Sequence, residues 1–218
     1  KQYLEKISAA LGKLEIALKN FSKNIHKIEK YYDFSIRQTI LNEARDLKLV
    51  ASNYHNRAYN NPELLIYNLK NSMNKLAAKI QLEGGARIEG VALIKPEQLL
   101  GIKIDKVTKT QKGIIFTKEK GGKQGEVLVS LKTYAELENH LSLNSKFKIN
   151  RQDYYNDIKQ AALISKEVSE GSHGLRWNFA KRRMFEYGKA DYSYYDSLQE
   201  VSYEMKHNRA SITEHYLC

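Results

Sequence analysis

The sequence contains very little proline and cysteine, and each shortage restricts the possible folds. Pro62 and Pro96 are the only prolines among 218 residues, so long helices can form without interruption. Cys218 is the single cysteine, which excludes an intrachain disulfide and is typical of a protein in a reducing cytoplasm. No apolar run approaches the length of a membrane span, and no signal peptide is apparent at the start. These absences argue against a membrane-spanning or disulfide-stabilised fold.

Acidic residues are also scarce relative to basic ones. The chain carries 36 Lys and Arg against 25 Asp and Glu, which gives a net charge of +11. This surplus favours a polyanionic partner, with nucleic acid first and an anionic membrane second, although a merely basic protein has the same composition. Hydrophobic residues make up 42% of the chain, enough for a packed core. The chain begins at Lys1 without an initiator methionine, which predicts a fragment of a longer protein.

The spacing of apolar residues predicts a mostly helical chain. The expected helices cover residues 3–30, 33–58, 63–82, 86–93, 131–141, 151–169, 172–187 and 197–207. Gly12 interrupts the first pattern, so residues 3–30 form either one bent helix or two short ones. Ser211 and Glu214 form a capping-box pattern, which predicts one more helix that begins near Ser211 and holds Tyr216 in its second turn.

In the middle of the chain the helical spacing of apolar residues gives way to short β-rich runs, which predict a small sheet. Three short β-rich runs occur at residues 102–107, 113–116 and 126–129. Gly121 and Gly122 lie between the second and third runs and have the composition of a hairpin turn. The simplest assembly is a three-stranded antiparallel meander, and the expected fold class is α+β and mostly helical.

One turn signal divides the chain into two parts. Asn60 and Asn61 precede Pro62, which suits the first turn of the next helix. We therefore expect a helical segment over residues 1–60 and a second domain over residues 61–218.

Four residues near the end of the chain have the types and spacing of a phosphoryl-transfer site. His173 and Arg176 are three residues apart in an expected helix, so they share a face and can converge on one ligand. His207 follows, and Tyr216 comes nine residues later. A guanidinium group can bind a phosphodiester, imidazoles can manage protons, and a phenol can attack phosphorus. Taken singly, the same residues also fit an ordinary helix start and a packing tyrosine.

Two upstream residues add positive charge to this set. Arg87 follows a glycine pair at an expected helix N-terminus, where free backbone amides suit a phosphate. Lys120 lies at the tip of the expected hairpin and can reach into a groove, with Lys118 and Lys123 as alternatives. A surface arginine and a solvated polar turn are the plainer interpretations of these two segments.

In this order, the segments resemble the tyrosine recombinase, or phage integrase, family. Gly85-Ala86-Arg87-Ile88 looks like the family's first-arginine segment, and residues 119–123 look like its β-hairpin lysine loop. Residues 173–176 are similar to its His-x-x-Arg box, and residues 204–216 resemble its closing segment, including the nine-residue offset from histidine to tyrosine. The resemblance covers roughly residues 62–218 and implies the catalytic domain of that family.

Three departures from the family pattern are visible. The acidic residue that usually lies three positions after the first arginine is replaced by Gly90, with Glu89 one position earlier. The glycine often found before the second histidine is Lys206, and the gap before that histidine is lengthened by the tyrosine-rich stretch Tyr187–Tyr195. These departures favour a divergent integrase of a mobile element over a chromosome-dimer resolvase. Residues 1–60 look at most like the end of a helical core-binding domain.

The resemblance also implies catalytic roles. Tyr216 would attack the scissile phosphorus and leave a 3′-phosphotyrosine with a free 5′-hydroxyl. Arg87 and Arg176 would bind the non-bridging oxygens, because their fork-shaped donors suit the transition state. Lys120 would protonate the leaving 5′-oxygen as general acid.

The two histidines complete the implied site. His173 would accept the tyrosine proton or position a phosphate oxygen, and His207 would hydrogen-bond the phosphate. No metal and no small-molecule cofactor is implied, because arginines supply the charge and the phosphotyrosine conserves the bond energy. The implied partner is double-stranded DNA, bound by a homo-tetramer in the bacterial cytoplasm.

Two other functions fit the same residues. A type IB topoisomerase shares this active-site chemistry and would relax supercoils as a monomer. A DNA-binding protein could also have kept the fold and lost the chemistry.

Overall fold

The computed structural model describes residues 56–207 and 209–217. The chain divides into two compact units, residues 1–55 and 56–218, and the described residues belong to the second unit. The helix expected over residues 3–30 lies outside the described residues. So does the helix expected over residues 33–58, except for its last three residues. The proposed domain boundary at residue 60 therefore stays a prediction.

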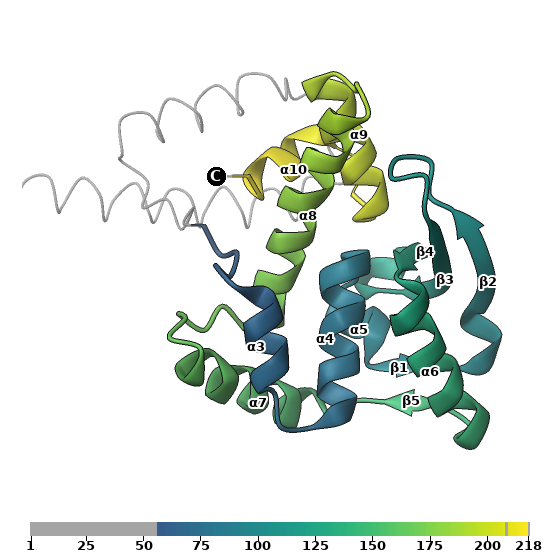
Figure 1. Ribbon diagram of the computed structural model, residues 1–218, viewed down its shortest axis with the longest axis vertical. Helices are drawn as coiled ribbons and strands as arrows, with labels where there is room; N and C mark the ends of the chain where they lie inside the picture. The colour runs from purple at the N-terminus through teal and green to yellow at the C-terminus, as the bar shows by residue number, and fades with distance from the viewer. Residues whose placement is uncertain (1–55, 208, 218) are drawn as a thin grey trace, which may run out of the picture. The chain divides into compact units, whose positions relative to one another are not determined.

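The second unit combines helices with two small sheets, which confirms the expected α+β class (Figure 1). Its helices are α3 (Pro62–Asn68), α4 (Ser72–Gly84), α5 (Ile88–Val91), α6 (Leu131–Leu143), α7 (Arg151–Ile164), α8 (Gly171–Lys189), α9 (Tyr194–Glu204) and α10 (Ala210–His215). Its strands are β1 (Leu93–Ile94), β2 (Leu99–Ile104), β3 (Gln111–Lys118), β4 (Gln124–Val129) and β5 (Phe147–Lys148), and two single 3₁₀ turns are η2 (Pro96–Gln98) and η3 (Lys120–Gly122).

The three-stranded meander is confirmed. Strands β2, β3 and β4 pair in that order, each antiparallel to the next. The first strand ends at Ile104, three residues earlier than expected, because the Asp105 carboxylate accepts hydrogen bonds from the backbone N–H groups of Val107 and Thr108 and turns the chain. A second sheet pairs β1 with β5 and was not predicted, since two-residue strands carry no alternating pattern.

The single helix expected over residues 63–82 is wrong, because the chain forms two helices there. The side chain of Asn71 accepts hydrogen bonds from the N–H groups of Met73 and Asn74 and caps the second helix. The Asp157 carboxylate on α7 accepts from the N–H groups of Lys70 and Asn71, so the break is also held from outside. Helix propensity alone does not reveal these tertiary partners.

Helix α8 is the central element, since it contributes to both hydrophobic clusters. Leu175 packs in the larger cluster, with α3, α4, α6 and α7. Trp177 and Phe179 pack in a smaller cluster that holds Tyr216 and residues of α9. Phe185 of the same helix stays outside both clusters, because its side chain is 64% exposed and lies against the Lys189 ammonium group.

The end of the chain differs from its expected form in one detail. Helix α10 begins at Ala210, and its N-cap residue Arg209 makes no side-chain cap hydrogen bond. The capping box expected at Ser211 is therefore wrong, because Ser211 already lies inside the helix. Tyr216 is the C-cap residue, which places its phenol at the end of a short helix.

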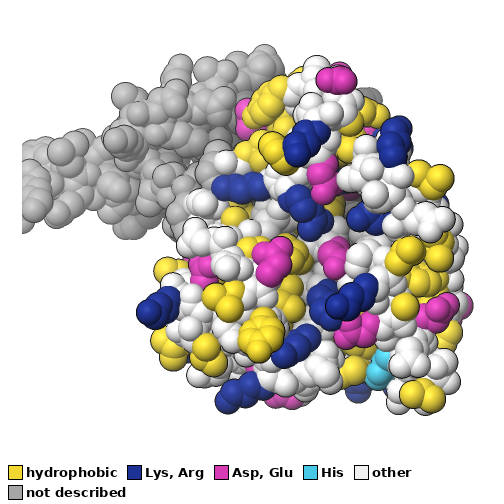
Figure 2. Space-filling model, viewed as in Figure 1, with side chains coloured by type: hydrophobic (Ala, Val, Ile, Leu, Met, Phe, Trp, Pro, Cys, Tyr) yellow, Lys and Arg dark blue, Asp and Glu magenta, His cyan; other side chains and the backbone are white. Residues whose placement is uncertain are grey.

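The surface mixes charges on the face seen in Figure 2. Lys and Arg side chains are interspersed there with acidic and hydrophobic ones. In the part of the chain that the structure describes, no helix combines the length and apolar character that crossing a bilayer requires.

Candidate active site

The turn between α4 and α5 positions Arg87. Gly85 ends α4 with φ +65, and a Cβ atom there would lie 2.4 Å from the Phe179 ring, so glycine is required. Arg87 is the N-cap residue of α5, and its side chain is 20% exposed. The turn at Gly84 and Gly85 therefore positions the partly exposed Arg87 guanidinium beside α8.

Helix α8 carries Arg176 in the interior. Its side chain is 1% exposed, and its guanidinium donates hydrogen bonds to the backbone oxygens of Gly85 and Met205. Two segments distant in sequence are thereby joined to α8. The Nε atom of Arg176 is buried and has no hydrogen-bond partner among the described residues.

His207 lies between the two arginines. Its Nε2 atom is 2.9 Å from Nη2 of Arg176 and 3.3 Å from Nη2 of Arg87. A guanidinium group has donors and no acceptor, so Nε2 accepts from both and the ring proton sits on Nδ1. The imidazole therefore aligns the two guanidinium groups.

Tyr216 lies beside the same cluster. Its ring centroid is 5.6 Å from that of His173 and 6.0 Å from that of His207, and it packs on Trp177 at 5.2 Å. Burial lowers the pKa of Arg176, and the nearby Tyr216 and Glu119 oppose this shift. The phenol is 5% exposed and is held by aromatic contacts.

Burial lowers the pKa of both histidines, and neighbouring arginines lower it further. The pKa of His173 falls to about 4, through burial, then Arg176 and Arg57. The pKa of His207 falls to about 3, through burial, then Arg176 and Arg87. Both rings are neutral at pH 7, and the Nε2 atom of His207 already accepts from the two arginines.

The two hairpin lysines Lys120 and Lys123 differ in exposure. Lys120 is exposed, whereas Lys123 is partly buried. Burial lowers the pKa of Lys123, and the charges of Arg87 and Arg176 lower it further. The structure brings together Arg87, His173, Arg176, His207 and Tyr216. The assignment of Lys120, or of its alternatives Lys118 and Lys123, stays a prediction.

Glu119 is a site residue that the sequence did not suggest. Its Oε2 atom lies 2.8 Å from Nη1 of Arg87, and its Oε1 atom lies 3.0 Å from Nζ of Lys206. Burial raises the pKa of Glu119, but Lys206 and Arg176 outweigh burial and lower it. The one sequence signal for its burial was strand alternation. Residues two apart in a strand share a face, and the buried Thr117 lies two residues before Glu119.

No group of three or more His, Cys, Asp or Glu side chains within residues 56–207 and 209–217 is arranged to hold a metal ion. The charges of the site come from arginine, lysine and one carboxylate.

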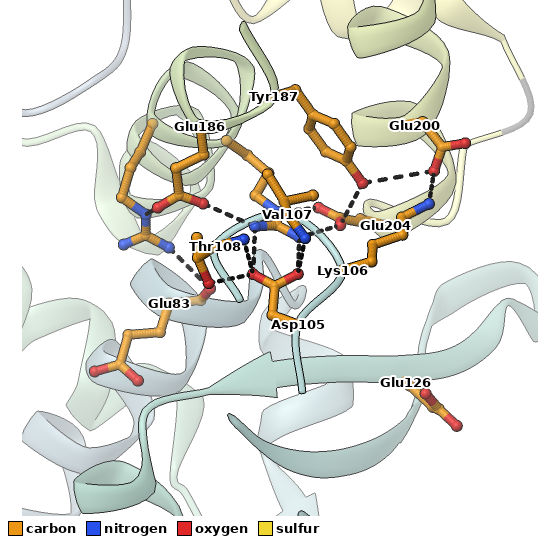
Figure 3. A network of polar contacts seen from close by, with 12 residues as sticks. Glu83, Asp105, Lys106, Val107, Thr108, Glu126, Glu186, Tyr187, Glu200 and Glu204 are labelled. Carbon is orange, nitrogen blue, oxygen red and sulfur yellow. Dashed lines mark hydrogen bonds and ion pairs between the residues drawn. The ribbon is translucent and has the colours of Figure 1, made fainter. Parts of the chain in front are cut away.

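A second ionic network lies about two turns further along α8, around Arg183 (Figure 3). Arg183 donates to Asp105 at 2.8 and 2.9 Å, to Glu204 at 2.7 Å and to Glu186 at 2.8 Å. It borders a cleft of about 600 Å³, whose charged groups largely pair with one another. This network ties α8 to α9 and to the turn after β2, so we assign it to the fold.

Comparison with solved structures supports the fold. No family model and no curated protein matches the chain. The chain resembles the XerH site-specific recombinase in a post-cleavage complex with its difH substrate (17% identity, TM-score 0.53, 71% of this chain and 46% of that one). It also resembles the XerA recombinase (13%, TM-score 0.54, 100% and 87%) and a lambda integrase dimer bound to a core site (14%, TM-score 0.52, 98% and 78%).

The described domain therefore has the fold of a tyrosine recombinase catalytic domain, as the resemblance predicted. The chain spans about half the length of the XerH chains that it matches.

Proposed function

We propose that this chain is a site-specific DNA recombinase, or integrase, that cleaves and rejoins strands through a 3′-phosphotyrosine. The observation that carries the proposal is the cluster in which His207 joins Arg87 to Arg176 with Tyr216 alongside. The cluster draws Arg87 from the α4–α5 turn, Arg176 from α8, and His207 and Tyr216 from the segment that follows α9.

Phosphate binding is the first step. Arg87 and Arg176 present donors on adjacent guanidinium groups, and a phosphodiester offers two non-bridging oxygens that can accept from both. Burial of Arg176 strengthens its pull on the charge that develops in the transition state.

The Tyr216 oxygen then attacks phosphorus, and the bond from phosphorus to the 5′-oxygen breaks. His173 lies beside the phenol, with ring centroids 5.6 Å apart, and its neutral ring is the group that we favour to accept the phenolic proton. The product is a 3′-phosphotyrosine, which a second 5′-hydroxyl can attack to rejoin the strands without a nucleotide cofactor.

Lys123 is the general acid that we favour for the leaving 5′-oxygen. A lysine whose pKa is lowered by burial and by neighbouring arginines gives up its proton more readily than an exposed one. The ammonium proton moves to the 5′-oxygen, and a free 5′-hydroxyl leaves. Lys120, being exposed, would instead contact solvent or the DNA backbone.

The proposal is tested by trapping the covalent intermediate. Duplexes that the 218-residue chain binds are selected from a random library and rebuilt as nicked suicide substrates, in which the cleaved 5′ fragment diffuses away. We expect an SDS-resistant adduct whose tryptic peptide carries a nucleotide on Tyr216. Tyr216→Phe should bind the same duplex and form no adduct.

Absence of any adduct from the wild-type chain, on every selected duplex and nick position, would falsify the proposal. The recombinase would act as a tetramer on two duplexes, and light scattering of the chain with its selected duplex measures that assembly.

A further inference from the structure

We propose that Glu119 is a positioning residue that holds Arg87 in its phosphate-binding conformation, a role that rests on the proposed DNA cleavage. Glu119 comes from the β3–β4 hairpin, whereas Arg87 comes from the α4–α5 turn. The two segments are thus joined at the reaction centre by one carboxylate.

Glu119 accepts hydrogen bonds from Arg87 at two points. Its Oε2 atom accepts from the guanidinium Nη1 at 2.8 Å, and its Oε1 atom accepts from the backbone N–H at 3.1 Å. Holding both ends of the side chain removes most of the rotamer freedom that an arginine otherwise has. Because the Glu119 side chain is 0% exposed, water does not compete for these oxygens.

The same carboxylate balances the charge of the cluster. Lys206 donates to Oε1 at 3.0 Å, and Nη1 of Arg176 lies 3.9 Å from Oε2. Three buried or half-buried cations therefore share one anion. Without it, Arg87 and Arg176 would repel one another across His207 and their guanidinium groups would separate.

The residue at position 90 is adapted to Glu119. A Cβ atom on Gly90 would lie 2.9 Å from Cγ of Glu119 and 3.0 Å from Cβ of Thr117. A side chain at position 90 and the glutamate at position 119 therefore compete for one space. The carboxylate that the family pattern expects on α5 is supplied here from the hairpin.

Lys206 is adapted in the same way. Its backbone has φ +58, a left-handed conformation that glycine adopts without strain and that lysine adopts at some cost. Its ammonium group reaches Glu119, which offsets that strain. Two of the three departures from the family pattern, Gly90 and Lys206, thus lie beside the Glu119 side chain.

Arginine side-chain NMR, recorded without any DNA, tests whether Glu119 restricts the rotation of the Arg87 guanidinium. A guanidinium held by a carboxylate rotates slowly and gives resolved Nη–H signals. We expect resolved Nη–H signals for Arg87 in the wild-type chain. Their absence from the Arg87→Lys spectrum assigns them. In Glu119→Gln these signals should disappear. The signals of Arg183, which other carboxylates hold, should persist as the internal reference.

Cleavage rates test the consequence. Glu119→Gln keeps the size of the side chain and loses its charge, so we expect adduct formation on the suicide substrate to slow by about 100-fold. DNA affinity should stay equal or rise, because the site becomes more positive. A merely destabilised protein would lose affinity and rate together.

Moving the carboxylate back to α5 supplies a matched control. Gly90→Asp with Glu119→Ala places a carboxylate on α5, and Gly90→Ala with Glu119→Ala has the same backbone and cavity without it. We expect the Asp variant to cleave at least about 10-fold faster than the Ala variant, since charge-assisted pairing is restored.

Three results would overturn the positioning role: unchanged Arg87 signals in Glu119→Gln, a cleavage rate within threefold of wild type, or equal rates for the two double variants when both fold. If the wild-type chain forms no adduct at all, the proposed function fails, and the Arg87 signals alone still decide whether Glu119 holds this side chain.

Discussion

The Nη2 atom of Arg176 lies 2.9 Å from the Nε2 atom of His207, although the two residues belong to separate segments of the chain. Arg176 also donates to the backbone oxygen of Met205, just before the turn that carries His207. One buried guanidinium therefore fixes the position of this turn relative to α8. Its planar fork makes these contacts at once, which a single ammonium group cannot do.

Arg176→Lys should therefore lose cleavage while keeping the positive charge. We expect adduct formation to fall by about 10²- to 10³-fold, the range seen when one transition-state donor is removed. Suicide-substrate kinetics measure the loss. Arg182→Lys on the same helix, whose side chain is 38% exposed, is the matched control and should cleave normally. A rate within threefold of wild type for Arg176→Lys would contradict the assignment.

The choice of Lys123 over Lys120 predicts a chemical rescue. Lys123→Ala should slow cleavage of an ordinary phosphodiester by about 10²- to 10⁴-fold, because the 5′-oxygen then leaves without a proton. A substrate with sulfur at the 5′ bridging position should restore most of the rate, since a thiolate leaves without protonation. Lys120→Ala should cleave both substrates like the wild type. Rescue of Lys120→Ala in place of Lys123→Ala would reverse the assignment.

The fold class and the meander could be predicted from the sequence, because periodicity and local spacing carry them, whereas the site residues were proposed through the resemblance to the recombinase family. The break at Asn71 could not, since it depends on Asp157 of a distant helix. Glu119 was missed for a similar reason: between two lysines at a hairpin it looks like a solvated residue, and only its burial against Arg87 reveals the contact.

The neutral histidines predict a loss of stability in acid. Burial and the arginines lower the pKa of His207 from 6.5 to about 3 and that of His173 to about 4, so the unfolded chain binds more protons between these values. Stability should be full above about pH 6.5 and fall as the pH drops toward 4. Denaturant midpoints, followed by fluorescence of the single tryptophan Trp177, measure this.

Replacing both histidines is the control for that pH dependence. His173→Gln with His207→Gln removes the two titrating rings and should flatten the decline between pH 6.5 and 4. An equally steep decline in the double variant would mean that other groups cause it.

The network around Arg183 predicts a large effect on stability with none on chemistry. Its side chain is 6% exposed and is paired with Asp105, Glu186 and Glu204. Arg183→Met should lower the free energy of unfolding by about 3–5 kcal/mol, because Asp105 is left buried without its counterion. Urea unfolding followed by tryptophan fluorescence measures the change.

Two further variants separate the buried charge from simple loss of packing. Arg182→Met removes a more exposed arginine from the same helix and should cost less than about 1 kcal/mol. Arg183→Met with Asp105→Asn should recover part of the loss, because no uncompensated carboxylate remains at position 105. If the second substitution instead adds to the first, the arginine stabilises the fold by packing, and the ionic network is not what holds α8 to α9.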